Sequence, residues 1–360
     1  MNGIAEIPLT DVGAGAAAAL FDAHAERAAA LIEGALGSHV FLPAAAVIAD
    51  RLSRRWLERQ GNLYLDEIHH VARRLGRPGV YFLNIVYEWA CSTSAAPDPG
   101  GEGARMIRVL DWGLTGIGRH IVLARQDTAH GPFYNATWPG FAGVLTAMAP
   151  GRFAAAINQA PRVPILGPRW LDEMIGRVRL LRQAGAIPAA HLLRRVFEEA
   201  RDYAGAQAML ADERHLLAAP ALFTLSGVDR DQACVIEAIG RQRRIHRALA
   251  EDAFTIGAAN DWLSGDLAGV PRAHAVEWST SVSPRENNRV RRSAVCALQR
   301  RPFAGAADLA PPVINSHTVL VAAANAAAGK MLVEALDPVP GPSPLPQVVA
   351  RRELRHAAPA

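Results

Sequence analysis

The sequence is poor in cysteine and in lysine, and both shortages limit the classes of protein to which it can belong. It has three cysteines, Cys91, Cys234 and Cys296, and no C-x-x-C pair. A disulfide framework and a thiolate zinc site are therefore excluded as first interpretations, and a reducing compartment fits the composition. Lys330 is the only lysine. Arginine provides nearly all of the positive side-chain charge. This preference for arginine over lysine is explained by genome composition as readily as by binding to an acidic partner.

A long apolar run and a strong excess of one charge are also missing. The sequence opens Met-Asn-Gly-Ile-Ala-Glu without a basic residue, and charged residues interrupt the alanines that follow. We therefore expect no signal peptide, no stable membrane insertion and a cytoplasmic location. The net charge of +4 comes from 38 basic and 34 acidic residues spread along the chain. The clusters of arginine contain no interleaved aromatic residues, so we expect no nucleic-acid binding.

Several motifs of catalysis and cofactor binding are absent from the sequence. No Gly-x-Ser-x-Gly exists for a serine hydrolase, and Gly329-Lys330 lacks the first glycine and the Ser/Thr of a phosphate loop. His69-His70 lies on a predicted helix without the i,i+4 ligand partners of a metal site, which favours exposed histidines over metal ligands. We expect no metal and no cofactor.

Hydrophobic periodicity divides the chain into helical and extended parts. It predicts helices over 14–36, 43–60 and 62–75, so the first ninety residues are predicted to be helical. Further helices are predicted over 168–184, 188–213 and 287–300. Short apolar runs bounded by Gly and Pro predict strands. These strands are 91–95, 105–111, 119–126, 131–137, 143–149, 152–158, 221–227, 232–239, 242–247 and 252–258, with a final hairpin of 318–324 and 330–336.

The order of these elements predicts the architecture. Sheet, two helices, sheet, helix and hairpin is typical of two stacked antiparallel sheets covered by helices on both sides. We predict an α+β protein with a helical segment at 1–90, a sandwich at 91–337 and a tail at 338–360. Prolines occupy every second position from 338 to 346, so we expect no regular structure in the tail.

Residues 80 to 111 concentrate the chemistry. An apolar run ends at Cys91, the Pro- and Gly-rich loop 96–104 has the composition of a hairpin connection, and a second run presents Arg108 and Asp111. Two paired strands would bring the thiol of Cys91 close to the two charged residues. A guanidinium lowers the pKa of a nearby thiol below its usual value of about 8.5, and the thiolate is the nucleophilic form. This stretch is therefore a candidate reactive centre.

The same stretch resembles the acid ceramidase and N-acylethanolamine acid amidase family, relatives of the choloylglycine hydrolases among the N-terminal-nucleophile (Ntn) hydrolases. The similar residues are Leu83-Asn84, Tyr87-Glu88, Cys91, Thr93-Ser94, Arg108 and Asp111. Three features depart from the family pattern: Ser92 adds a residue to the usual Cys-Thr-Ser, Val109 replaces the usual Asn, and the spacing from Cys91 to Arg108 is one residue longer. The resemblance extends over about 75–336 and is densest over 80–158.

The resemblance implies a reaction and a processing step. Family members cut themselves before the cysteine, which implies scission of the Ala90-Cys91 bond and two fragments that stay associated. The new α-amine of Cys91 would then act as the base for its own thiol. Arg108 would stabilise the thiolate, and Asp111 would orient the α-amine. The implied fold is the Ntn αββα sandwich.

Three other stretches also resemble the family. Residues 137–158 end at Asn158, where relatives place an oxyanion-hole backbone amide; without the resemblance, Asn158 is equally well a turn residue. In Ala258-Ala-Asn-Asp-Trp, Asn260 would donate its side-chain amide to the oxyanion, and the alternative is a helix cap. The stretch from Asn287 places Arg289 as a second arginine near the nucleophile, with Arg291 and Arg292 as alternatives.

Together these residues predict a cysteine Ntn amidohydrolase of linear, non-peptide amides with a small-molecule substrate. Trp112, Phe133, Tyr134 and Trp138 suggest an apolar acyl group on that substrate. Two alternatives stay open, an acyltransferase of the penicillin acyltransferase type and an unprocessed, ligand-binding pseudoenzyme. The other two cysteines are predicted to be inert core thiols.

Overall fold

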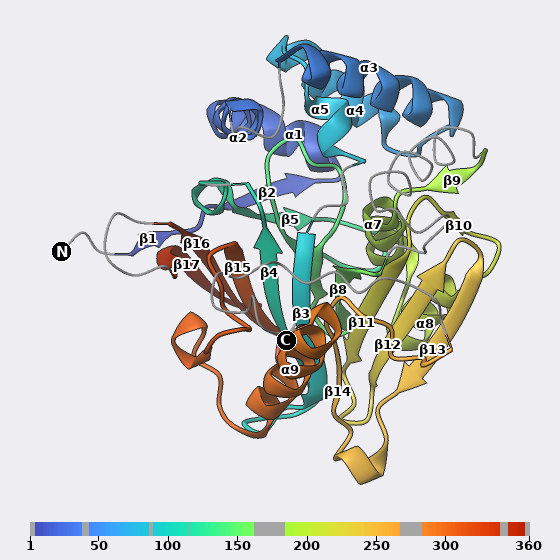
Figure 1. Cartoon of the computed structure of the whole chain (residues 1–360), viewed down its shortest axis with the longest axis vertical. Helices are drawn as coiled ribbons and strands as arrows, with labels where there is room; N and C mark the ends of the chain where they lie inside the picture. Colours follow the sequence, from blue (N-terminus) through green and yellow to red (C-terminus); the bar gives the residue numbers. More distant parts are fainter. Residues whose placement is uncertain are drawn as a thin grey trace.

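A computed structural model of the chain describes residues 4–37, 43–85, 89–114, 116–161, 184–266, 283–338 and 345–356, and two stacked sheets form its centre (Figure 1). Sheet A has the order β1 (Ala5–Glu6), β17 (Gln347–Arg355), β16 (Lys330–Asp337), β15 (Thr318–Asn325), β4 (Ala104–Trp112), β3 (Trp89–Pro97) and β14 (Ile256–Ala258). Sheet B has the order β13 (Gln242–Arg247), β12 (Ala233–Ile239), β11 (Ala221–Gly227), β8 (Phe153–Gln159), β7 (Thr146–Ala149), β6 (Phe133–Thr137), β5 (Val122–Gln126) and β2 (Leu9–Gly13). A small parallel pair joins β9 (Ala186–Ile187) to β10 (Leu216–Leu217).

Helices cover both outer faces of this pair of sheets. Helix α9 (Pro284–Ala297) lies against β3 and β14 of sheet A, while α7 (Ala189–Glu199) and α8 (Tyr203–Ala211) lie against sheet B. Phe197 of α7 packs on Phe153 of β8 with ring centroids 4.7 Å apart. The layers are helix, sheet, sheet and helix, and the predicted α+β fold with αββα layering is confirmed.

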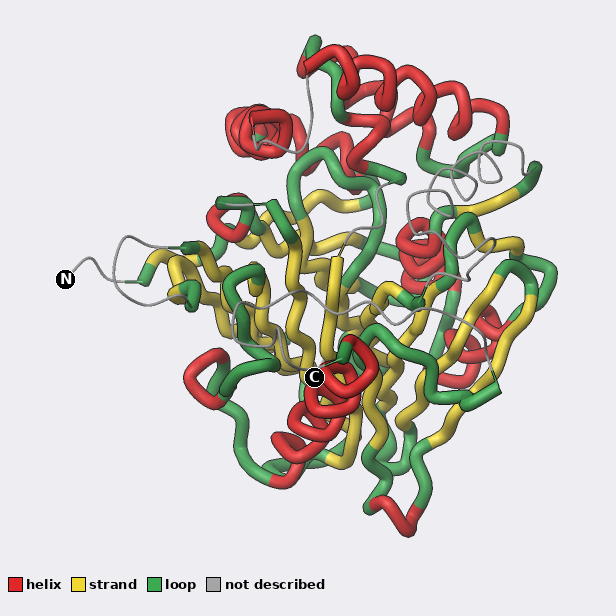
Figure 2. The backbone as a smooth tube through the Cα atoms, in the orientation of Figure 1, coloured by secondary structure: helices red, strands yellow, loops and turns green. Residues whose placement is uncertain are grey.

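The N-terminal helices form a separate layer at one end of the sheets, seen at the top of Figure 2. They are α1 (Ala16–Ala23), α2 (Ala25–Gly37), α3 (Pro43–Arg59), α4 (Leu65–Leu75) and α5 (Val80–Leu83). Trp56, Ile68 and Val80 share one apolar cluster between them. No helix within the described ranges is long and apolar enough to cross a membrane.

The prediction of a wholly helical segment 1–90 is wrong, because its first part is extended. Strand β1 pairs in parallel with β17 of sheet A, and β2 pairs in parallel with β5 of sheet B. These two strands add parallel edges to sheets whose other ladders are antiparallel. The N-terminal segment is therefore part of both sheets.

The prediction of an irregular tail at 338–360 is also wrong. The proline series ends at Pro346, and the next nine residues form β17, which pairs with β16 in antiparallel orientation. Val348 and Val349 begin this strand with branched side chains that favour extended structure. Arg351 of β17 lies 2.9 Å from the buried carboxylate of Glu334 on β16.

We expect a chain truncated after Pro346 to be less stable than the full chain. Truncation removes Arg351 and leaves Glu334 without its cation, which costs about 1–3 kcal/mol, and it exposes the edge of β16 to association with other chains. Urea unfolding and size-exclusion chromatography measure both effects. Removal of residues 357–360 alone, beyond β17, is the control; equal stability of the two truncated chains would contradict a structural role for β17.

Most other predicted elements are confirmed within one to three residues. The helix predicted over 188–213 is two helices, because the chain turns to extended backbone at Ala200 and Asp202 caps α8 through the amide of Gly205. The helix predicted at 168–184 lies almost wholly outside the described residues. The β3–β4 hairpin forms as predicted, and Gly103 in its loop has a φ of +72° that favours glycine.

Candidate active site

The β3–β4 hairpin sorts the predicted residues onto two faces of sheet A. Its ladder sets Thr93 opposite Arg108, and Ala90 opposite Asp111. Because successive side chains of a strand point to opposite faces, Cys91 shares a face with Thr93 and Arg108, whereas Asp111 shares the other face with Ala90. The first face looks toward sheet B and the second toward α9. The ladder is continuous through Ser92 and Val109, so these two departures from the family pattern cause no register shift.

The thiol of Cys91 is fully buried between the two sheets. Its Sγ lies 3.8 Å from the carbonyl oxygen of Ile157 on β8. Burial raises the pKa of Cys91 to about 11, although the Arg108 guanidinium and a hydrogen bond from the Gln159 backbone amide work in the opposite direction. At neutral pH the thiol is therefore protonated.

Arg108 presents its guanidinium donors on the same face as this thiol. One Nη donates to Thr93 Oγ1 at 3.1 Å and to the side-chain oxygen of Asn158. The Nε and the second Nη are buried and have no hydrogen-bond partner among the residues that the structure describes. A buried cationic donor without an acceptor is costly. The predicted placement of Arg108 beside Cys91 agrees with this geometry.

Asp111 occupies the opposite face, next to the backbone rather than the sulfur of Cys91. Its carboxylate accepts hydrogen bonds from Asn315 Nδ2 at 2.8 Å and Thr318 Oγ1 at 2.7 Å. Arg291 of α9 lies 3.7 Å away. Burial raises the pKa of Asp111, and the charge of Arg291 opposes that shift. The carboxylate sits beside the place that Ala90 fills in the ladder.

Asn260 contacts the backbone on both sides of the predicted site. Its Oδ1 accepts the backbone N–H of Cys91 at 2.9 Å, and its Nδ2 donates to the carbonyl of Gln159 at 2.7 Å. It follows β14 and precedes no helix among the described residues, so the alternative of a helix cap is wrong. Its side chain touches the nitrogen of the bond that was predicted to break.

Asn158 lies within β8 and acts through its side chain, so the alternative of a turn residue is wrong. Its Nδ2 donates to the carbonyls of Ala258 at 3.1 Å and Ala259 at 3.0 Å. The backbone amide that faces the Cys91 thiol is that of Gln159. The prediction of an Asn158 backbone donor is therefore shifted by one residue, because successive amides of a strand point to opposite neighbours.

The second arginine of the site is Arg291, and the prediction of Arg289 is wrong. Arg289 is exposed and pairs with Glu286 on the surface of α9. Arg291 is buried, and its guanidinium donates to the carbonyl of Cys91 at 3.1 Å and to Asn260 Oδ1 at 2.9 Å. Side chains two positions apart on a helix point to nearly opposite sides, so Arg289 and Arg291 are separated.

Helical spacing holds the signal that identifies Arg291. Asn287, Asn288 and Arg291 stand at i, i+1 and i+4, and all three are buried. Arg291 donates to Asn287 Oδ1 at 3.1 Å and to Asn288 Oδ1 at 2.6 Å. Because residues at this spacing lie on one side of a helix, the two asparagines and the arginine predict a polar face that is buried. The alternative Arg292 is half-buried and pairs with Asp261 at 3.2 Å.

Only part of the predicted aromatic wall lies near Cys91. Trp89, on the same face as Cys91, packs edge-on against Trp112 with centroids 5.7 Å apart, and Trp112 packs against Trp138 at 5.3 Å. The other two predicted aromatic residues lie elsewhere. Phe133 stacks on Phe197 of α7, and the Tyr134 hydroxyl bonds His356.

The segment before Cys91 is tied to the rest of the sandwich. Asn84 donates to the carbonyl of Gly140 at 3.1 Å and accepts the amide of Ala142 at 2.7 Å. Buried Leu83 joins the main core. The similar pair Tyr87-Glu88 lies outside the described residues.

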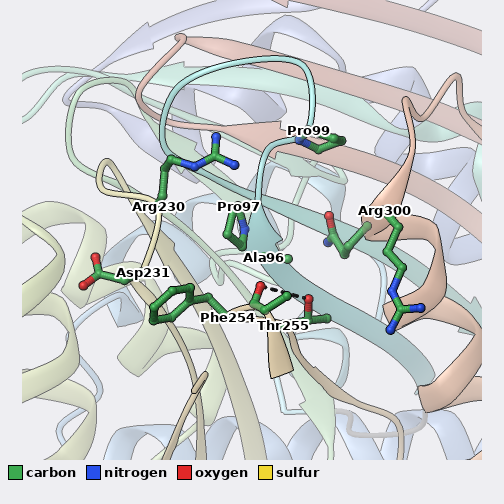
Figure 3. A pocket seen from close by; sticks show the side chains of 10 residues that line it. Ala96, Pro97, Pro99, Arg230, Asp231, Phe254, Thr255 and Arg300 are labelled. Atoms are coloured by element: carbon green, nitrogen blue, oxygen red, sulfur yellow. Dashed lines mark hydrogen bonds between the residues drawn. The ribbon is translucent and has the colours of Figure 1, made fainter. Parts of the chain in front are cut away.

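A surface groove of about 570 Å³ lies at the other end of β3 (Figure 3). Ala96 and Pro97 line it together with Arg230, Phe254 and Arg300. Cys91 is not among its lining residues and stands five positions before Ala96 on an extended strand, so the groove is separate from the candidate site.

The other two thiols and the pair His69-His70 lie outside the candidate site. Cys234 is buried on β12, and Cys296 on α9 is partly buried. His69 bonds the Tyr81 hydroxyl at 2.8 Å, and His70 pairs with Asp22 at 3.0 Å. In the described part of the chain, no group of three His, Cys, Asp or Glu side chains is placed to hold a metal ion.

Comparison with known proteins finds structural likeness only. No protein-family model and no curated protein match the chain. An N-acylethanolamine-hydrolyzing acid amidase ortholog from Caenorhabditis elegans is 17% identical with a TM-score of 0.48, over 66% of this chain and 93% of that one. Penicillin V acylase from Agrobacterium tumefaciens is 14% identical with a TM-score of 0.35, over 68% and 82%. A mutant conjugated bile acid hydrolase from Clostridium perfringens is 7% identical with a TM-score of 0.40, over 73% and 92%.

Proposed function

We propose that the chain is a cysteine N-terminal-nucleophile amidohydrolase that cleaves linear amides after cutting itself at Ala90-Cys91. One observation carries the proposal: the bond before Cys91 lies where the thiol faces the Arg108 guanidinium and the nitrogen faces Asn260. A thiol buried for packing alone has no need of buried polar groups around it. Denaturing mass spectrometry of the purified protein, followed by an amide-substrate panel, tests the proposal.

In the self-cleavage step, Cys91 Sγ attacks the carbonyl carbon of Ala90. The carbon–nitrogen bond breaks, the nitrogen gains the thiol proton, and the acyl group passes to sulfur as a thioester. Water then hydrolyses the thioester, which leaves a carboxylic acid on Ala90 and a free amine and thiol on Cys91. Asp111, opposite Ala90 in the ladder, then stands beside the new amine and orients it.

In the amidase step the new α-amine takes the thiol proton, and the sulfur attacks the substrate amide. Arg108 stabilises the thiolate through the donors that lack partners in the uncut chain. The Gln159 amide and the Asn260 side chain hold the oxyanion, for which one donor is worth about 3–4 kcal/mol. The protonated amine releases the leaving group, and water clears the thioester. The proposed residues need no metal or cofactor.

The two fragments are expected to stay together after the cut. Arg194 of α7 lies 2.6 Å from Glu67 of α4 and sits over the ring of Tyr64 at 3.8 Å. The Tyr64 hydroxyl donates to Glu198 of α7 at 2.7 Å. These buried contacts join residues before the cut to residues after it, in addition to β1 and β2.

The space that Trp89 fills is the proposed acyl pocket. Trp89 lies two residues before Cys91 on the same face of β3 and packs against Trp112. We expect amides with a ring-bearing acyl group to have a kcat/KM about ten- to a hundredfold above the matching acetyl amides, since burial of such a group is worth roughly 1.5–3 kcal/mol. Steady-state kinetics on a series that varies only the acyl group measures this ratio. Equal values for both acyl groups would contradict the assignment.

Two alternatives give different results in the same experiments. An acyltransferase transfers the thioester to an added amine, which product analysis detects. The second alternative is a ligand-binding pseudoenzyme, which the buried, protonated thiol of the uncut chain favours. An intact Ala90-Cys91 bond and resistance of Cys91 to thiol labelling would identify it.

A further inference from the structure

The loop that carries Asn260 leaves sheet A after β14 and is anchored on sheet B. The anchor is Glu237 of β12, whose side chain is fully buried. One carboxylate oxygen accepts the backbone amides of Leu263 and, at 3.1 Å, Ser264. The other accepts the Ser264 hydroxyl. Three donors from one short turn thus converge on a single carboxylate.

His246 of β13 completes this anchor. Its Nε2 lies 2.9 Å from Glu237 and 3.1 Å from Ser264 Oγ. Burial alone would raise the pKa of Glu237, but the bonds from His246, Ser264 and the Leu263 amide outweigh it and hold the pKa below its usual value. The three residues are not a hydrolase triad, because one ring nitrogen faces both partners and no relay across the ring is formed.

The anchored turn begins three residues after Asn260, whose side chain meets the backbone amide of Cys91. Asn260 is fixed on one side by Asn288, which accepts its backbone amide at 3.0 Å. Glu237 fixes the other side of the turn through Leu263 and Ser264. Between these two supports the Asn260 side chain reaches the Cys91 amide at 2.9 Å.

We propose that Glu237 is a positioning residue, which sets Asn260 against Cys91 by holding the turn at 263–264. The inference rests on the proposed function, in which Asn260 donates to the oxyanion. An error of about 1 Å in the place of a catalytic group can reduce a rate about a hundredfold. A carboxylate is needed at residue 237 because every group that hydrogen-bonds to it is a donor, except that the ring of His246 can take either role.

The first test compares Glu237→Gln with Glu334→Gln in the full, processed protein. Glu334 is a matched control, a buried carboxylate of β16 that accepts the Ala306 amide and pairs with Arg351, outside the site. For Glu237→Gln we expect kcat to fall about ten- to a hundredfold with little change in KM, because an oxyanion donor acts in the transition state. Glu334→Gln is expected to keep kcat while losing stability. Equal kcat losses in both variants would overturn the inference.

A double-variant cycle identifies the group through which Glu237 acts. If it acts through Asn260, then adding Glu237→Gln to Asn260→Ala lowers kcat no further, and the two effects are not additive. Fully additive effects overturn the inference while leaving the proposed function intact. Rescue of kcat by Glu237→Asp supports it, since a carboxylate is restored.

Amide hydrogen exchange tests the same contacts without turnover. In chains that also carry Cys91→Ala and so stay uncut, Glu237→Gln should accelerate exchange at residues 91, 263 and 264. Faster exchange at 263 and 264 with no change at 91 would mean that Glu237 holds the turn without affecting the contact between Asn260 and Cys91. That result overturns the inference. This readout holds even if the wild-type chain proves inactive, a result that counts against the proposed function.

Discussion

Replacement of Cys91 by alanine should abolish both the cut and the amidase activity. The variant lacks the sulfur that accepts the acyl group of Ala90, so denaturing mass spectrometry should show one full-length chain where the wild-type protein shows two fragments. Activity on any amide should fall to background, because the thiol and the amine of one residue supply both nucleophile and base. The removed side chain is small and buried, and we expect the variant to fold.

Cys234→Ala is the matched control for this experiment. Cys234 is also a fully buried thiol on a strand with neighbours on both sides, and its pKa is likewise raised by burial. It lies on β12, outside the site, so the control chain should be cut and active. A Cys91→Ala chain that still divides at residue 90, or still hydrolyses amides, would remove Cys91 from the mechanism.

Replacement of Arg291 by methionine should destabilise the protein and stop processing. Arg291 is buried beside the equally buried Asp111, 3.7 Å away, and bonds the carbonyl of Cys91. Loss of one partner of a buried ion pair costs about 3–5 kcal/mol, because the other charge stays buried without compensation. Urea unfolding measures the loss, and mass spectrometry measures the uncut fraction.

Arg289→Met, two residues along the same helix, is the control. Arg289 is exposed and pairs only with Glu286 among the described residues, so its loss should leave stability and processing nearly unchanged. Addition of Asp111→Asn to Arg291→Met should recover part of the lost stability, since the orphaned charge is removed. Equal effects of the two arginine variants would return the site to the sequence-based prediction of Arg289.

The hairpin around Cys91 was predictable because its signals are local. Turn residues at 96–104 fix the pairing of the two flanking strands, and pairing fixes which side chains share a face. The position of Asp111 on the other face follows from the same alternation, since Arg108 and Asp111 are an odd number of residues apart. The sequence-based reading missed this detail because it treated proximity along the hairpin as proximity in space.

The errors arose where pairing joins distant parts of the chain. Strands β1 and β2 are short and pair with β17 and β5, so no hairpin signal announces them. Strand β17 was missed because the irregular structure expected of the proline series was assumed to continue beyond Pro346. Arg291 was left as an alternative because the spacing of Asn287, Asn288 and Arg291 was not used to find the buried face of the helix.

The two N-terminal edge strands have a consequence for how this protein can be made. Expressed from separate genes, residues 1–90 and 91–360 would each have unpaired strand edges. The first piece would lack the partners of β1 and β2, and the second would expose β5 and β17. We therefore expect neither piece to be recovered in native form alone, and soluble material only from co-expression. Maturation would then convert one chain into two that depend on each other, with the same neighbours as before.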